Sequence, residues 1–80
     1  MNRKIIFISV QDIFRDIFDD DSLIILDTTS SDNIEEWDSL NHILLISSIQ
    51  EEFKIKISLE EMQLKSNVEF LVNMILRKIK

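Results

Sequence analysis

Residues 38–53, DSLNHILLISSIQEEF, predict the central helix of a small helical domain. Asp38 is a favourable N-cap, because its carboxylate can accept a hydrogen bond from a free N–H group of the first turn. At about 100° per residue, one face of this helix is apolar and carries Leu45, Ile46, Ile49 and Phe53. The opposite face carries Leu40, Leu44, Ser47, Ser48 and Glu51. We therefore expect the first face in the core, whereas Leu40 and Leu44 are leucines that the core does not obviously need.

The segment upstream predicts a first helix, from about Arg3 to Phe18, followed by a long loop. The helix has one apolar stripe, formed by Ile6, Val10, Ile13, Phe14 and Ile17. The run DDDS, residues 19–22, should end it, because carboxylates at a helix C-terminus oppose the helix dipole. Residues 23–36 should form a structured loop that packs its apolar residues on the helices, since no partner strand is predicted elsewhere. Within this loop, the polar residues have turn chemistry, and residues 33–36 could form a short turn of helix.

The C-terminal part contains two matches to the S-x-x-E capping box, which marks helix N-termini. The first, Ser58 to Glu61, opens a short third helix of about residues 59–64, and the second, Ser66 to Glu69, opens a last helix of about residues 67–79. The last helix has an apolar stripe, formed by Val68, Leu71, Val72, Ile75 and Ile79. The sequence thus predicts an all-α fold: a small helical bundle of three principal helices plus a short helix, with a long loop after the first helix.

Composition limits the class of protein. Eighty residues suffice for one domain, which we place at residues 1–80. The chain contains no cysteine, which excludes disulfides and thiolate metal sites, and no glycine, which argues against phosphate-binding glycine loops. The apolar run at residues 5–10 is too short for a signal peptide or a membrane span. We therefore expect a cytoplasmic protein that does not enter a membrane.

The acidic residues are concentrated in the middle of the chain. Residues 16–53 hold eleven Asp or Glu and no Lys or Arg, and the formal net charge is -6. This balance disfavours nucleic acid as a partner, because binding phosphates needs clustered cations. The acidic stretch indicates either basic partner proteins, steered by electrostatics, or a solvated surface that maintains solubility. We expect a monomer.

The stretch WDSLNHI, residues 37–43, resembles the attachment site of the acyl carrier protein family. The resemblance continues through IQEEF at residues 49–53, IKI at 55–57 and NVEFL at 67–71, and it covers about residues 27–79; the first helix fits in pattern only. Trp37 before the Asp-Ser pair is typical of stand-alone carriers of specialised pathways. Four features depart from the family pattern: Lys54 stands where glycine is usual, Glu36-Trp37 where a small pair such as Gly-Ala is frequent, Leu44 where an acidic residue is common, and Ser47 where methionine is common.

The resemblance implies that Ser39 carries a 4'-phosphopantetheine arm, which a phosphopantetheinyl transferase attaches from coenzyme A with magnesium. The arm would hold an acyl or aminoacyl cargo as a thioester for loading and acyl-transferring enzymes, and the chain itself would not be a catalyst. The resemblance also implies a partner-recognition surface at Asp38, Leu40, Leu44 and Glu51. Phe70 and Met74 should be core neighbours, or alternatively could line a cleft for the cargo.

Other interpretations of the same residues stay open. Asp38 and Ser39 could merely cap a helix, and the chain could be a small acidic interaction module, unmodified, that binds a partner through the Leu40/Leu44 face. A hydrolase using Asp38, Ser39 and His42 is disfavoured, because no oxyanion hole is implied. In addition, an Asp adjacent to the Ser is badly placed to orient the His.

Overall fold

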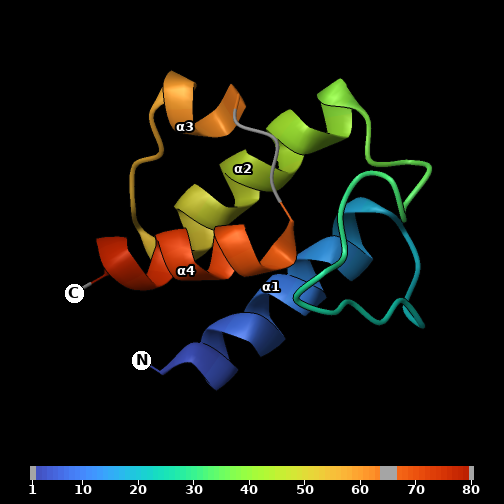
Figure 1. Cartoon of the computed structure of the whole chain (residues 1–80), viewed down its shortest axis with the longest axis horizontal. Helices are drawn as coiled ribbons and strands as arrows, with labels where there is room; N and C mark the ends of the chain where they lie inside the picture. The colour runs from blue at the N-terminus through green and yellow to red at the C-terminus, as the bar shows by residue number, and fades with distance from the viewer. Residues whose placement is uncertain (1, 64–66, 80) are drawn as a thin grey trace.

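The computed structural model describes residues 2–63 and 67–79. Within these residues the helices are α1 (Arg3–Ile17), α2 (Ser39–Phe53), α3 (Leu59–Gln63) and α4 (Val68–Lys78). In Figure 1, α1, α2 and α4 are packed together, the short α3 lies at one side, and the loop between α1 and α2 covers one end. The predicted all-α architecture of three principal helices and one short helix is confirmed. Among the described residues, no helix is long and apolar enough to cross a membrane.

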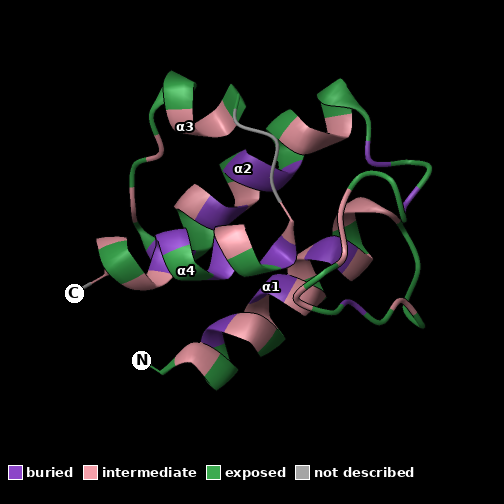
Figure 2. Ribbon diagram, in the orientation of Figure 1, coloured by how far each residue is buried: buried purple, intermediate pink, exposed green. Residues whose placement is uncertain are grey.

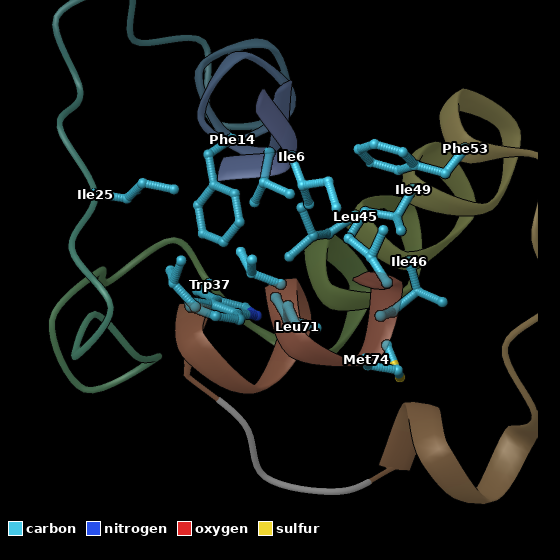
Figure 3. Close-up of a cluster of buried hydrophobic side chains, with 14 of the residues drawn as sticks. Ile6, Phe14, Ile25, Trp37, Leu45, Ile46, Ile49, Phe53, Leu71 and Met74 are labelled. Atoms are coloured by element: carbon cyan, nitrogen blue, oxygen red, sulfur yellow. The ribbon is translucent and has the colours of Figure 1, made fainter. Parts of the chain in front are cut away.

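The core lies between α1, α2 and α4, because α1 packs against both of the other long helices. Figure 3 shows side chains of α1, α2 and α4 pointing toward one another, with Ile25 and Trp37 of the loop closing one side. The apolar faces predicted for the three long helices supply most of the buried residues: Ile6, Val10, Phe14, Leu45, Ile46, Ile49, Phe53, Val68, Leu71, Val72 and Ile75. Met74, outside the predicted stripe of the last helix, is buried as well. Three stripe residues are only partly buried: Ile13, Ile17 and Ile79. The periodicity therefore located the core and overestimated how deeply these three residues are buried.

The loop between α1 and α2 is held on α1 by polar side chains. Arg15 Nε donates to the carbonyl oxygen of Leu23 at 2.7 Å, and the backbone N–H of Ile25 donates to Gln11 Oε1 at 3.0 Å. These contacts turn Ile25 into the core, while its neighbour Ile24 stays 72% exposed. The predicted structured loop is thus confirmed. Residues 33–36 are not a turn of helix, because hydrogen bonds three residues apart form separate turns there, such as Trp37 N–H to the Ile34 carbonyl.

Two of the helices end at a left-handed residue that is not glycine. Asp19, after α1, has φ 51°, and Lys54, after α2, has φ 54°. After α1, the N–H of Asp20 donates to the Arg15 carbonyl and that of Asp19 to the Asp16 carbonyl, the pattern of a Schellman motif. Helix α1 thus ends at Ile17, one residue before the predicted end at Phe18. Its end is set by this hydrogen-bonded turn together with the unfavourable charge of the carboxylates that follow.

The N-terminus of α4 is completed by the distant loop. Its N-cap is Asn67, whose Oδ1 accepts from the N–H of Phe70 at 2.9 Å. The next two N–H groups, of Val68 and Glu69, donate to loop carbonyls, those of Thr29 and Asp27 respectively. Ser66, the predicted start of this capping box, lies outside the described residues. The N-cap of α4 is therefore Asn67. The loop carbonyls accept hydrogen bonds from the Val68 and Glu69 N–H groups, which the Asn67 side chain leaves free.

Candidate functional site at the start of α2

Ser39 is the first residue of α2, and it is exposed. The preceding Asp38 has extended backbone, its Oδ1 accepts from the N–H of Asn41 at 2.8 Å, and its carbonyl accepts from the N–H of His42 at 2.9 Å. The predicted N-cap is therefore confirmed. Because the cap fixes the first turn, the Ser39 hydroxyl is presented to solvent from a defined backbone position.

The residues before Ser39 are anchored on both sides of the helix start. Trp37 is buried, 6% exposed, and its ring meets the edge of Phe14 with centroids 5.1 Å apart. From the other direction, Asn41 Nδ2 donates to the Glu36 carbonyl at 2.7 Å. Ser39 thus stands between a residue fixed in the core and a turn closed by hydrogen bonds, which holds the site in place.

Both ring nitrogens of His42 are engaged. Its Nδ1 accepts from Trp37 Nε1–H at 3.0 Å, and its Nε2 lies 2.8 Å from the carbonyl oxygen of Met62 in α3. Since the indole N–H can only donate and the carbonyl can only accept, the ring is the neutral tautomer with its proton on Nε2. His42 therefore has no free nitrogen to act as a base on Ser39, and the Asp38 carboxylate is used by the helix cap, which argues further against the hydrolase interpretation.

The outward face of α2 next to Ser39 is apolar. Leu40 is 67% exposed and Leu44 45% exposed, and Asp38 and Glu51 are also exposed. In Figure 2 the N-terminal turns of α2 appear largely exposed, in contrast with its buried inner face. Ile43, 49% exposed, lies on the same side of the helix and was not among the predicted surface residues. The expectation that the Leu40/Leu44 face lies outside the core is consistent with these exposures, whereas its role in recognition stays a prediction.

The short helix α3 lies beside this site. Its predicted capping box is present: Glu61 N–H donates to Ser58 Oγ at 3.1 Å, and Ser58 N–H donates to Glu61 Oε1 at 3.0 Å. Glu61 also pairs with Lys78 of α4 at 3.0 Å. Hydrogen bonds from the Ser58 backbone, and then from the Lys78 ammonium, lower the pKa of Glu61 to about 2. The Glu61 carboxylate thus closes the first turn of α3 and ties it to α4.

The other side chains considered from the sequence have local structural roles. Met74 is buried and Phe70 packs partly buried against the core, so the two are core neighbours as predicted. In the acidic run after α1, Asp20 accepts hydrogen bonds from the hydroxyl of Ser22 and then from its backbone N–H, and these bonds lower the pKa of Asp20. Among residues 2–63 and 67–79, no three acidic or histidine side chains are grouped to hold a metal ion.

A bundle of three principal helices and one short helix, with a capped and exposed serine at the start of its second helix, has the architecture of a carrier domain. The chain is similar to a solved structure, the solution NMR structure of holo acyl carrier protein from Geobacter metallireducens, with 40% sequence identity and a TM-score of 0.83. The match covers 91% of this chain and 84% of that chain. No protein-family model and no curated protein matches the chain. At this identity and coverage, the chain belongs to the acyl carrier protein family, and the resemblance found in its sequence is confirmed.

Members of this family are carriers that serve partner enzymes and are not themselves catalysts, so this chain has a carrier role in general terms.

Proposed function

We propose that this protein holds an acyl or aminoacyl cargo as a thioester on a 4'-phosphopantetheine arm attached to Ser39. The observation that carries the proposal is the exposed Ser39 directly after the Asp38 cap, at the first residue of α2. The similar carrier from Geobacter metallireducens is described in its holo form. When bound, the arm supplies a terminal thiol on which the cargo is carried.

The helix start has the electrostatic properties that an attached phosphate requires. A helix N-terminus has positive partial charge and free N–H groups, which favour an anion. Among the residues that the structure describes, none accepts a hydrogen bond from the N–H of Ser39 or Leu40. At α4, by contrast, the N–H groups of Val68 and Glu69 are occupied by loop carbonyls. The start of α2 therefore offers the N–H groups of Ser39 and Leu40 as donors beside an exposed Ser39, and we propose that it accommodates a phosphodiester on this serine.

Attachment is a phosphoryl transfer carried out by a separate phosphopantetheinyl transferase with magnesium. The Ser39 hydroxyl oxygen forms a bond to the phosphorus that bears the pantetheine group of coenzyme A. The bond between that phosphorus and the bridging oxygen of the pyrophosphate breaks, and adenosine 3',5'-bisphosphate leaves with this oxygen. The transferase takes the proton of the Ser39 hydroxyl. The contribution of this chain is to present the hydroxyl from a rigid first turn, which lowers the entropic cost of positioning it.

Partner enzymes read the face around Ser39 in this proposal. Leu40 and Leu44 are the apolar anchors, and two acidic residues, the N-cap Asp38 and Glu51 of α2, are also exposed. Buried apolar anchors supply most of the binding energy in such contacts, while charges at the rim steer the encounter. Leu44 stands where carriers of fatty acids commonly have an acidic residue, so we propose loading enzymes of a specialised pathway.

The test is co-expression with a broad-specificity transferase, followed by intact-mass analysis. We expect one phosphopantetheine on the wild type and none on Ser39→Ala, with unchanged helical circular dichroism. Ser31→Ala, at an exposed serine of the loop, is the matched control and should be modified normally. A mass increment that survives Ser39→Ala would remove Ser39 from the proposal. Wild-type protein that stays unmodified with the transferase and in its native host would favour the alternative, an unmodified interaction module that uses the Leu40/Leu44 face.

A further inference from the structure

His42 joins three parts of the molecule that are separate in the sequence. It lies one helical turn after Ser39, its ring stacks on Trp37 with centroids 6.1 Å apart, and its Nε2 reaches the Met62 carbonyl of α3. Trp37 is itself fixed by the core through its contact with Phe14. The imidazole is therefore oriented from one side by a buried indole and presents its N–H to α3 from the other.

Helix α3 has few other attachments. It has five residues, none of them buried, so it lacks the apolar face that holds the other helices in place. Among residues 2–63 and 67–79, α3 also contacts the rest of the fold through the ion pair of Glu61 with Lys78 and the partly buried side chain of Met62. An ion pair between partly exposed side chains constrains position weakly. The hydrogen bond from His42 is the directional contact between α3 and the helix that begins at Ser39.

Only one form of the His42 ring can make both contacts. Trp37 Nε1–H needs an acceptor at Nδ1, and the Met62 carbonyl needs a donor at Nε2. Because Trp37 fixes the tautomer, it also fixes the donor that faces α3. A side chain that lacks either an acceptor toward Trp37 or a donor toward Met62 would leave the indole N–H or the α3 carbonyl without its partner.

We propose that His42 is a positioning residue of this carrier: it holds α3 at a fixed distance from the first turn of α2, so that the surface around Ser39 is presented to partner enzymes in one arrangement. The proposal rests on the proposed function of Ser39 and adds a residue that touches neither the arm nor the reacting atoms. When α3 is released, only a fraction of molecules present the competent surface, and the apparent affinity of a partner falls by that fraction.

The decisive variant is His42→Phe, which keeps a planar ring beside Trp37 and removes both hydrogen bonds. The reporter of α3 is the amide of Met62, which donates to the Ser58 carbonyl at 2.9 Å, and the internal reference is the amide of Leu71 in α4. We expect the protection of Met62 against hydrogen exchange to fall about threefold to tenfold relative to Leu71, the factor that one net hydrogen bond represents. The indole N–H resonance of Trp37 should shift as its acceptor is lost.

Transferase kinetics supply the functional measurement on the same proteins. With coenzyme A saturating, His42→Phe should raise the KM for the carrier by the inverse of the fraction of molecules that keep α3 in place, which reaches about threefold to tenfold where release of α3 predominates in the variant. Its kcat should stay within about twofold, because the Asp38 cap that orients Ser39 is independent of α3. His42→Gln, whose amide has one acceptor and one donor, should restore part of both effects. Glu61→Gln, which weakens the other attachment of α3, should raise the same KM.

Three results would overturn the proposal. The first is a His42→Phe variant in which the Met62 amide is as protected against hydrogen exchange as in wild type. The second is a His42→Phe variant in which this protection falls but the KM for the carrier does not change. The third is a His42→Gln variant that restores neither the protection nor the KM. A wild-type protein that accepts no arm would instead overturn the proposed function of Ser39, and the exchange data would then decide by themselves whether His42 holds α3.

Discussion

Replacing Ile75 by alanine tests whether α4 closes the core. Ile75 is 0% exposed and lies in the middle of the apolar stripe of α4. The change removes three carbon atoms, which at about 0.8 kcal/mol for each buried methylene costs about 2.4 kcal/mol in transfer free energy. The cavity left behind adds to this value, so the expected loss is about 2–5 kcal/mol. A domain of 80 residues has a total stability of about 4–12 kcal/mol, so the loss is a large share of it.

The assay is urea unfolding of wild type and variant, followed by circular dichroism and by the fluorescence of Trp37, which is the chain's one tryptophan. We expect a lower midpoint with an unchanged slope, which indicates a change in stability rather than in the surface exposed on unfolding. Ile24→Ala is the matched control, because this isoleucine is 72% exposed and its loss should cost about 0.5 kcal/mol or less.

A loss below about 0.5 kcal/mol for Ile75→Ala, or equal losses for the two variants, would refute the burial of Ile75 in the core. If Ile75→Ala does not fold, Ile75→Val provides the same test on a smaller scale, with an expected loss of about 0.5–1.5 kcal/mol.

Three further predictions concern surface positions. Leu44→Glu should change the free energy of unfolding by about 0.5 kcal/mol or less and should slow loading by the cognate enzyme, since a charge enters an apolar contact; loading at the normal rate would mean that the partner reads another surface. Lys54→Gly should stabilise the protein by about 0.5–1 kcal/mol in urea unfolding, because Lys54 adopts φ 54°, which a Cβ disfavours; no gain would mean that the helix end relaxes without cost. Glu61→Gln should be less stable than wild type above about pH 4.5, and the difference should vanish as pH falls toward 2, because the folded-state pKa of Glu61, about 2, lies below its ordinary value of 4.5. A difference between these two proteins that does not depend on pH would contradict the hydrogen bonds of the Glu61 carboxylate with the Ser58 backbone and Lys78.

The helices and their inner faces could be predicted from the sequence because both depend on neighbours within a few residues. The stripe on residues 38–53 requires only the helical period, and the buried residues of α2 are the four expected ones. The Asp38 cap and the Ser58–Glu61 capping box involve partners three residues apart, and both are present. The motif behind the proposed attachment site at Ser39 can be recognised for the same reason, since it is contiguous.

The contacts that assemble these parts depend on residues far apart in the chain. The N–H groups at the start of α4 are satisfied by the carbonyls of Thr29 and Asp27, and Gln11 binds the backbone of Ile25. Glutamine and a bare carbonyl have no periodic signature, so no local pattern could pair them. Helix-end geometry was also hidden, because Asp19 and Lys54 adopt left-handed backbone at positions where the expected signal is glycine.

His42 shows most clearly what the tertiary structure alone decided. From the sequence, its place three residues after Ser39 made it either a weak candidate for catalysis or a residue of packing. In the fold, the Trp37 indole and the Met62 carbonyl occupy its two nitrogens, one five residues before it and the other twenty residues after it. The sequence by itself determined that a helix begins at Ser39 with an imidazole one turn along, because caps and periods are local. Only the folding of α3 back against α2 decided what that imidazole does, since the partners of a hydrogen-bonding side chain are set by which groups the fold brings within about 3 Å of it.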